Sequence, residues 1–288
     1  MTPRLSLPVV NWRAVVLSLV CVVAVSGAAP LAAQQLEYRS PAGVEYRARP
    51  DTGPIARARD ALAREPRNVD LIIALGVAQS GALQFREAVE TFTHGLAIAP
   101  GNAMLYRWRG HRHLSLREFD KALADLTHGM AIDSTNYGIL FHLGIIRFIR
   151  GEFSAAAELF RRAQPVAPNP GELAGSTDWR WMSLARAGRL TEAQTMLEQR
   201  PDSLPVDPNY GYARRLALYR GTIRPSELIR DGDDETTVAT LAYGLGNWNL
   251  VRGDTAAART MFKRSLASGG WAAFGFILSE VELDRMRR

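Results

Sequence analysis

The feature that most constrains this sequence is a 34-residue period, which relates the segments 69–102, 103–136 and 137–170 to one another. When the three segments are aligned, six columns each hold one kind of residue. The columns are Gly76, Gly110 and Gly144; Phe85, Phe119 and Phe153; Ala88, Ala122 and Ala156; Phe92, Leu126 and Phe160; Gly95, Gly129 and Ala163; and Ile98, Ile132 and Val166. Self-similarity at a fixed period of this length predicts a solenoid built from one repeated supersecondary unit.

Each unit is expected to be a pair of helices. In the first segment, apolar residues recur at helical spacing up to Gly76, the pattern breaks near Gly81, and it resumes from Phe85 to Phe92. Pro100 then ends the second helix, because proline cannot continue one. The glycine is expected where two helix backbones approach closely. One pair cannot bury its apolar face alone, so neighbouring pairs must stack.

This pattern resembles the tetratricopeptide repeat family, whose signature has a small residue at the eighth place, alanine at the twentieth, an aromatic residue or leucine near the twenty-fourth and proline at the thirty-second. The first and third segments match it throughout, with Gly76, Ala88, Phe92 and Pro100 and with Gly144, Ala156, Phe160 and Pro168. The middle segment departs mildly, with Ser134 in place of the proline and Arg109 in place of a leucine. The resemblance implies an all-α fold, an α-solenoid of stacked antiparallel helix pairs that winds as a right-handed superhelix.

The repeat pattern continues beyond residue 170 with small insertions and deletions. A glycine followed five residues later by a small residue recurs at Gly188, Gly221 and Gly253. We therefore expect a fourth repeat over 174–207, a weak fifth over 207–238 and a sixth over 239–270. Capping helices are expected at both ends of the solenoid (53–288), over 54–65 and 271–287, each with one wetter side. In the C-terminal capping helix, one face carries the apolar residues Phe274, Ile277, Leu278 and Val281.

The N-terminal 33 residues are expected to be a targeting segment and not part of the folded domain. Arg4 and Arg13 precede an uncharged, largely apolar run that ends in small residues, which is the pattern of a secretory signal peptide. Cleavage is expected after Ala28 or Ala33. The alternative is an uncleaved membrane anchor, because about 20 apolar residues can span a bilayer. Residues 34–52 show no clear period and are expected to be an extended linker.

The cysteine count and the net charge exclude several classes of site. Cys21 is the only cysteine, so a cleaved chain has no disulfide, cysteine nucleophile or thiolate metal site. The formal charge of +6 falls to +4 once Arg4 and Arg13 are removed with the leader. This excess is too small to indicate nucleic-acid binding, which needs a dense basic stripe.

No catalytic motif stands out in the sequence, which has no phosphate loop, zinc-protease helix or nucleophile elbow. His94 and His128 are one repeat position copied twice, and a structural or solvent-facing role is expected. The acidic segment 231–235 begins like a calcium loop but lacks the glycine and glutamate that such a loop needs, so a solvated loop is expected. We therefore expect no enzyme activity, no metal and no cofactor. The alternative is an enzymatic or enzyme-associated role for His111 and His142, whose places in adjacent repeats put them near each other.

The surface with a candidate function is the inner face of the solenoid, which the first helix of each pair lines. The resemblance implies that this face holds a protein or peptide partner. Its candidate residues are Arg107, Trp108, His111, Phe141, His142, Ile145, Trp179, Tyr212, Arg215, Tyr243 and Asn247. Aromatic residues with arginine and histidine suit a peptide with apolar side chains and some acidic character. The alternative is that the aromatic side chains only fill space between adjacent helices. The family's charge clamp for C-terminal carboxylates is absent, because Ile73 and Val77 occupy its places.

These features favour an exported, non-enzymatic scaffold, periplasmic or secreted, that binds a protein or peptide in cell-envelope assembly or secretion. No nucleic acid and no small-molecule cofactor is expected as a partner. A membrane is expected as a partner only if the leader is retained.

Overall fold

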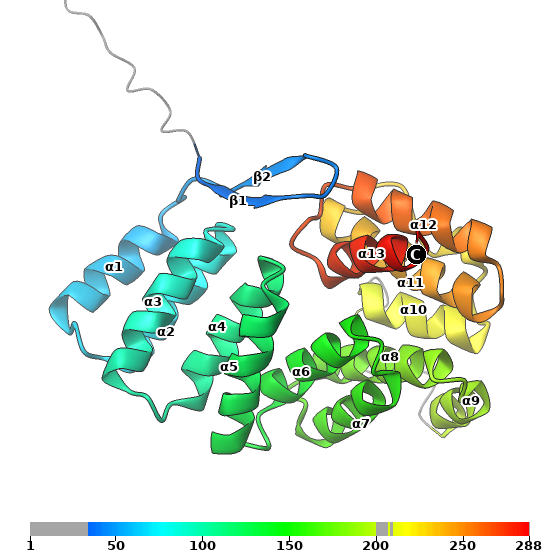
Figure 1. Cartoon of the computed structure of the whole chain (residues 1–288), viewed down its shortest axis with the longest axis horizontal. Coiled ribbons are helices and arrows are strands. Elements are labelled where there is room, and N and C mark those ends of the chain that lie inside the picture. The colour runs from blue at the N-terminus through cyan, green and yellow to red at the C-terminus, as the bar shows by residue number, and fades with distance from the viewer. Residues whose placement is uncertain (1–33, 200–206, 208–209, 288) are drawn as a thin grey trace, which may run out of the picture. The chain divides into compact units, whose positions relative to one another are not determined.

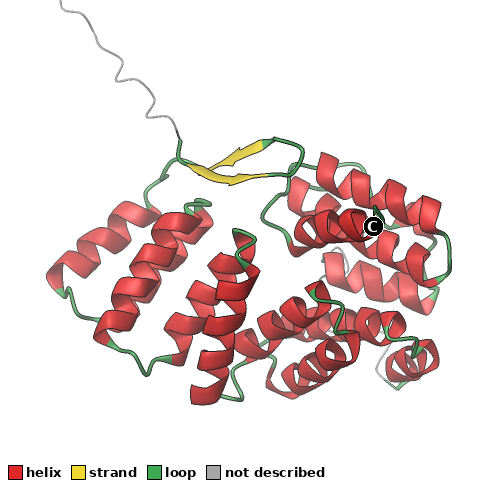
Figure 2. Ribbon diagram, viewed as in Figure 1, coloured by secondary structure: helices red, strands yellow, loops and turns green. Residues whose placement is uncertain are grey.

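Helices paired in chain order make up most of the structure, so the expected all-α solenoid is confirmed (Figure 1 and Figure 2). The computed structural model describes residues 34–199, 207 and 210–287, and the expected leader lies outside these residues. The described residues belong to one compact unit that begins at Gln34. Within that part of the chain, no helix combines the length and the apolar character needed to cross a membrane.

The helix pairs follow the repeats of the sequence. The aligned segments form α2 (Val69–Gly81) with α3 (Phe85–Ile98), α4 (Ala103–Ser115) with α5 (Phe119–Ile132), and α6 (Tyr137–Ile149) with α7 (Phe153–Ala163). The fourth and sixth repeats form α8 (Pro170–Arg186) with α9 (Leu190–Glu198), and α11 (Glu235–Val251) with α12 (Thr255–Ala267). The weak fifth repeat has one helix, α10 (Gly211–Arg220), followed by the short 3₁₀ turn η2 (Pro225–Glu227) where a second helix would stand. Another 3₁₀ turn, η1 (Gln164–Val166), follows α7, and the end helices are α1 (Pro54–Arg64) and α13 (Phe274–Arg285).

A repeated asparagine fixes where the first helix of each aligned pair begins. The side chains of Asn68, Asn102 and Asn136 each accept a hydrogen bond from a backbone N–H in the first turn that follows. Such a cap satisfies donors that a helix start leaves unpaired. Each of these pairs has a residue with a positive φ two positions after the end of its first helix. These residues are Leu83, Arg117 and Gly151. The left-handed residue reverses the chain between the two helices of a pair.

Close contact between the two helices of a pair explains the glycine column. A Cβ atom built on Gly144 would lie 2.6 Å from the ring of Phe160, and one on Gly110 would lie 2.7 Å from Leu126. Gly246 has the same relation to Phe262 in the sixth repeat. In each case the large residue follows the glycine by sixteen positions and is fully buried. The glycine therefore leaves the space that the ring or leucine of the second helix fills.

Residues 34–52 differ from the extended linker that the sequence predicts, because they contain an antiparallel hairpin. Strand β1 (Leu36–Arg39) pairs with strand β2 (Glu45–Arg47). The ring of Tyr46 lies 5.6 Å from Trp271 and 5.6 Å from Phe276, so the hairpin packs on residues near the other end of the chain. These aromatic contacts give a short two-stranded hairpin the tertiary support that it lacks in isolation.

Helix α13 contacts helices far from it in the sequence, which the cap prediction did not anticipate. Arg117 donates to Glu280 at 2.9 Å, and Arg186 donates to Glu282 at 2.9 Å. Arg285 also donates to the backbone carbonyl of Phe148 at 3.2 Å. We call the pairs Arg117–Glu280 and Arg186–Glu282 the closing ion pairs. Because α13 packs on α11 and α12 as well, it buries more than the one face that the sequence predicts.

A paired glycine substitution tests the packing of the repeats. Gly144→Ala should lower the free energy of unfolding by about 1–3 kcal/mol, because the added methyl group overlaps Phe160. Gly81→Ala, also in the first helix of a pair, meets nothing within 4 Å and should leave stability unchanged or raise it by up to about 1 kcal/mol. Denaturant unfolding followed by circular dichroism measures both. Equal effects of the two substitutions would contradict the assignment of the glycine column.

Candidate functional site

The candidate site begins with the side of α4 that faces the interior of the helix stack. Arg107, Trp108 and His111 lie on this side at helical spacing, and all three are half-buried. The guanidinium carbon of Arg107 lies 3.6 Å from the centre of the Trp108 ring. The His111 ring stacks on His142 of α6, with ring centres 4.1 Å apart. The two histidines of adjacent repeats are therefore neighbours, as the sequence predicts.

A hollow of about 290 Å³ lies beside this side of α4. Its wall comes from α4, the start of α10, the first turns of α11 and the segment that leads into α13. The lining residues are His111, Tyr210, Gly211, Tyr212, Thr236, Thr237, Thr240, Ala272, Ala273 and Phe274. Two of the sequence-predicted residues, His111 and Tyr212, thus line one cavity. The ring of Phe274 lies 5.5 Å from His111 and 5.7 Å from His142, so the segment entering α13 closes one side.

Most of the other predicted inner-face residues are buried in the protein core. The aromatic rings of Trp179 and Tyr243 stack at 5.8 Å, and Tyr243 continues the stack onto Phe262. Phe141 and Ile145 belong to the same apolar cluster. These four predicted residues fill space between helices in this structure, as the packing alternative describes. The hollow described above borders the part of the inner face on α4 and the start of α10.

Two predicted polar residues take part in buried interactions. Arg215 of α10 lies 2.9 Å from Asp178 of α8, and both side chains are fully buried. Burial raises the pKa of Asp178 to about 7, against the opposing effect of the Arg215 charge. Asn247 of α11 accepts a hydrogen bond from Arg186 at 3.1 Å. Both therefore join neighbouring helices to one another.

The inner side of α4 carries positive charge that is largely shielded from water. Burial lowers the pKa of Arg107 to about 10 and that of Arg112 to about 9. Burial also lowers the pKa of His111 well below 6.5, and the charges of Arg112, His142 and Arg107 lower it further. The pKa of His142 is lowered by burial and by the same two arginines. At neutral pH the arginines are therefore charged donors, whereas each of the two neutral imidazoles offers one hydrogen-bond donor and one acceptor.

The enzymatic alternative depends on the His111–His142 pair. The two rings are stacked, and in the part of the chain that the structure describes neither Nδ1 atom has a hydrogen-bond partner. A histidine that acts as a general base needs a proton-donating nucleophile within hydrogen-bond reach and commonly a group that orients its ring. The geometry brings the histidines together, and among the described residues no nucleophilic side chain forms a hydrogen bond with either ring.

The remaining polar motifs are structural or exposed. His94 and His128 are exposed to solvent, as the sequence predicts. In the acidic segment 231–235, Asp233 accepts two hydrogen bonds from Arg214 and Asp234 caps α11. Among residues 34–199, 207 and 210–287, no cluster of three or more histidine, cysteine or acidic side chains has the arrangement of a metal site.

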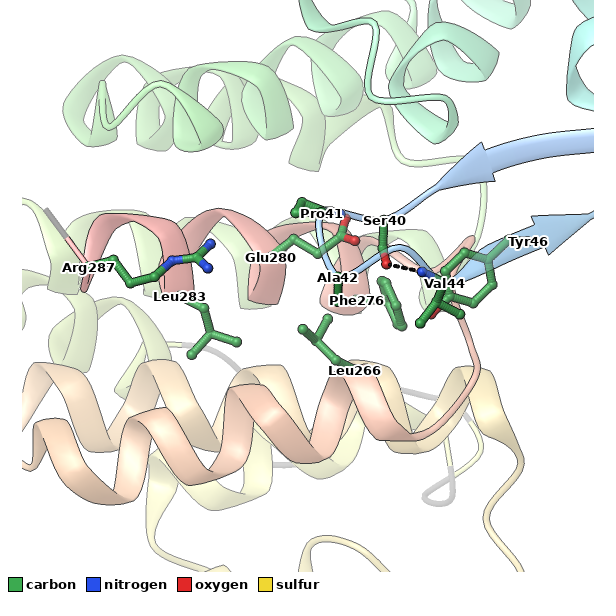
Figure 3. Close-up of a pocket in the computed structure, with 10 residues that line it drawn as sticks. All are labelled: Ser40, Pro41, Ala42, Val44, Tyr46, Leu266, Phe276, Glu280, Leu283 and Arg287. Carbon is green, nitrogen blue, oxygen red and sulfur yellow. Dashed lines mark hydrogen bonds between the residues drawn. The ribbon is translucent and has the colours of Figure 1, made fainter.

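A second cavity was not predicted from the sequence. It measures about 200 Å³ and lies between the hairpin turn, α12 and α13 (Figure 3). Figure 3 shows Leu266, Phe276 and Leu283 around it, with Glu280 from the same helix as Phe276 and Arg287 just beyond the end of that helix. The signal in the sequence was the alternation of apolar and polar residues on either side of Pro41-Ala-Gly43, which is typical of a short hairpin.

The comparisons with known proteins agree on the architecture. No family model matches the chain. It is 25% identical over 124 residues to small glutamine-rich tetratricopeptide repeat-containing protein 2 of Saccharomyces cerevisiae, which covers 43% of this chain and 36% of that protein. It is 27% identical over 113 residues to protein bimA of Emericella nidulans, which covers 38% of this chain and 14% of that protein. The chain therefore spans well under half the length of either curated relative.

A solved structure shares the fold over most of the chain. The Cut9–Hcn1 hetero-tetramer of the APC/C superposes with a TM-score of 0.51 at 15% identity, over 74% of this chain and 36% of that one. The 34-residue period, the helix pairs stacked in chain order and these likenesses together show that the chain has the architecture of a tetratricopeptide repeat solenoid.

Proposed function

We propose that this chain is an exported, non-enzymatic scaffold that binds a protein or peptide at the inner side of α4, in cell-envelope assembly or secretion. The observation that carries the proposal is the hollow lined by His111, Tyr212 and Phe274, with the half-buried side chains of Arg107 and Trp108 on the same helix as His111. Half-buried aromatic residues and arginine are the residue types that contribute most at protein interfaces. The repeat architecture supports the same role, because stacked repeats form extended binding surfaces.

Of the predicted inner-face residues, Arg107, Trp108, His111 and Tyr212 are half-buried and accessible to a partner. The predicted inner-face residues that are buried are proposed to hold the helices in place. A partner peptide is proposed to lie along α4 and across the start of α10, with an aromatic or aliphatic side chain in the hollow. The cationic side of α4 favours a partner with acidic groups.

Export is proposed from the leader alone. Residues 1–33 have a basic start, an apolar middle and a small-residue end, which is the composition of a secretory signal peptide. The location proposed is periplasmic or extracellular, and a form held in the membrane by a retained leader is the alternative.

A matched pair of double variants tests the binding role of α4. Arg107→Gln with Trp108→Leu should reduce recovery of cross-linked partner from the envelope fraction by at least about tenfold, since interface arginine and tryptophan side chains each contribute on the order of 2 kcal/mol. Arg252→Gln with Trp248→Leu is the control for α11: the Arg252 guanidinium, just after the end of α11, lies 4.3 Å from the centre of the Trp248 ring, and neither residue lines the hollow.

The control variant should recover the same partner as the unchanged chain, and both variants should keep their helical circular dichroism. Undiminished recovery with the α4 variant, or an equal loss with the α11 variant, would show that the inner side of α4 is not the binding surface.

The intact mass of the protein from its native host tests the export proposal. We expect a chain that lacks residues 1–28 or 1–33, because small residues precede both positions. Recovery of a chain that retains the leader and fractionates with membranes would contradict the exported form and support the membrane-tethered alternative.

A further inference from the structure

Aromatic rings from three parts of the chain meet in the lining of the hollow beside α4. The Tyr210 and Tyr212 rings, at the start of α10, lie edge to face with their centres 5.5 Å apart. The Phe274 ring lies 5.5 Å from His111. All four side chains are partly exposed, and Tyr210 is the most open of them, with 38% of its surface accessible. The hollow therefore presents aromatic rings to a ligand.

No charged group is found among the described residues that line the hollow. Arg107 and Arg112 are outside the lining, and their guanidinium groups lie over the rings of Trp108 and Phe85. Burial lowers the pKa of His111 well below 6.5, so this imidazole is neutral at pH 7. A charged ligand group would lose water in the hollow without gaining an opposite charge, which is unfavourable. The hollow therefore suits an uncharged group.

Hydroxyl groups in the lining are available as hydrogen-bond donors. Tyr212 accepts a hydrogen bond from the indole N–H of Trp179 at 3.3 Å, which leaves its own O–H available to donate. The hydroxyl groups of Tyr210 and Thr236 make no hydrogen bond with the residues that the structure describes. Thr240, in contrast, donates to the backbone carbonyl of Thr236. Hydroxyl donors beside aromatic rings suit a ligand with accessible carbonyl oxygens.

Among the ways in which proteins bind peptides, these features match recognition of an extended proline-rich segment. Such a segment forms a polyproline II helix, which has no internal hydrogen bonds and docks in aromatic-lined grooves. Proline is uncharged and has no backbone N–H that would need an acceptor. A partner strand would need a free sheet edge, and an amphipathic helix would need a long apolar groove. The hollow measures about 290 Å³ and is bordered by helices and the segment before α13, so it provides neither.

A neutral sugar is less well matched to the lining than a proline-rich peptide. Adjacent sugar hydroxyls are best paired by carboxylate, amide or guanidinium groups, because these groups offer two hydrogen-bonding atoms side by side. None of those groups is among the described residues of the lining.

We propose that the hollow beside α4 binds proline residues of a partner segment in the polyproline II conformation, packed against Tyr210, Tyr212 and Phe274, with the tyrosine hydroxyl groups donating to its carbonyls. This inference rests on the binding role proposed above, and it narrows the side chain that enters the hollow to proline. Acidic groups of the same partner are expected outside the hollow.

Calorimetric titration of the full chain with a decaproline peptide, acetylated and amidated so that it carries no charge, measures this binding. We expect saturable binding. A blocked glycine–serine peptide of the same length lacks the rings and the preformed conformation, and should not bind. Maltotriose is titrated as a neutral sugar. Absence of saturable decaproline binding, equal affinity for the glycine–serine peptide, or binding of maltotriose alone would overturn the proposal.

Substitutions of tyrosine test which residue holds the peptide. Tyr210→Ala should weaken decaproline binding by at least about tenfold, because tyrosine is among the residues that contribute most at interfaces. Tyr210→Phe keeps the ring and should weaken binding by about two- to tenfold, through the lost hydroxyl group. The control is Tyr106→Ala, since the Tyr106 ring lies 4.3 Å from His128 and is not part of the lining. It should leave binding unchanged, and equal weakening by the two alanine substitutions would contradict the assignment.

Histidine NMR signals of the unsubstituted chain locate the bound peptide. His111 lines the hollow, so its ring signals should move to saturation as decaproline is added. His94 and His128 are exposed and are not part of the lining, so their signals should stay in place. Movement of the His94 or His128 signals without movement of the His111 signals would place the binding elsewhere and overturn the proposal.

The outcomes separate this inference from the binding role of α4. Loss of partner recovery with the α4 double variant, combined with no decaproline binding, would support the binding role and overturn the assignment to proline. Undiminished partner recovery with that variant, combined with saturable decaproline binding at His111, would contradict the role of α4 in binding the partner and support the proline site.

Discussion

The closing ion pairs determine what the helix stack encloses. Arg117 and Glu280 are 163 residues apart in the sequence, and Arg186 and Glu282 are 96 apart, yet each pair is in hydrogen-bond contact and mostly shielded from water. Arg117 also donates to the backbone carbonyl of Trp271, which supports the aromatic contacts of the hairpin. Loss of one partner would leave the other charge uncompensated at a site that water screens only weakly, which is strongly destabilising. These contacts hold α13 against helices of the second to fourth repeats.

This closure explains why the inner face is not a continuous open groove. The segment that enters α13 brings Phe274 onto the two histidines, and the core helices bring Trp179 and Tyr243 into one aromatic stack. The remaining hollow lies where α4, α10 and α11 meet that segment. Its polar lining comes from His111 of α4, from Tyr210 and Tyr212 at the start of α10, and from the threonines in the first turns of α11. A site of limited size, rather than a long channel, is therefore the natural place for recognition in this chain.

Local periodicity predicted the helix pairs, but it could not predict contacts between distant repeats. The glycine column can be recognised in the sequence because Gly144 and Phe160 are in contact within one helix pair, and so recur at a fixed spacing. The burial of Phe141 and Ile145 depends on how the pairs stack and on α13 returning to them, which no 34-residue period encodes. Residues 34–52 were predicted to be an extended linker, because the apolar–polar alternation of the two strands extends over only four and three residues. The proximity of His111 and His142 was predicted correctly, since equivalent positions in adjacent repeats lie side by side.

A double-mutant cycle on Arg117 and Glu280 tests the closure most directly. Arg117→Met, Glu280→Gln and the combined variant are unfolded with denaturant, and the interaction energy is taken from the three changes in the free energy of unfolding. The closed arrangement predicts a favourable coupling of about 0.5–3 kcal/mol, as for residues in direct contact. Strictly additive effects would contradict it, because they would mean that α13 does not lie against the end of α4 in solution.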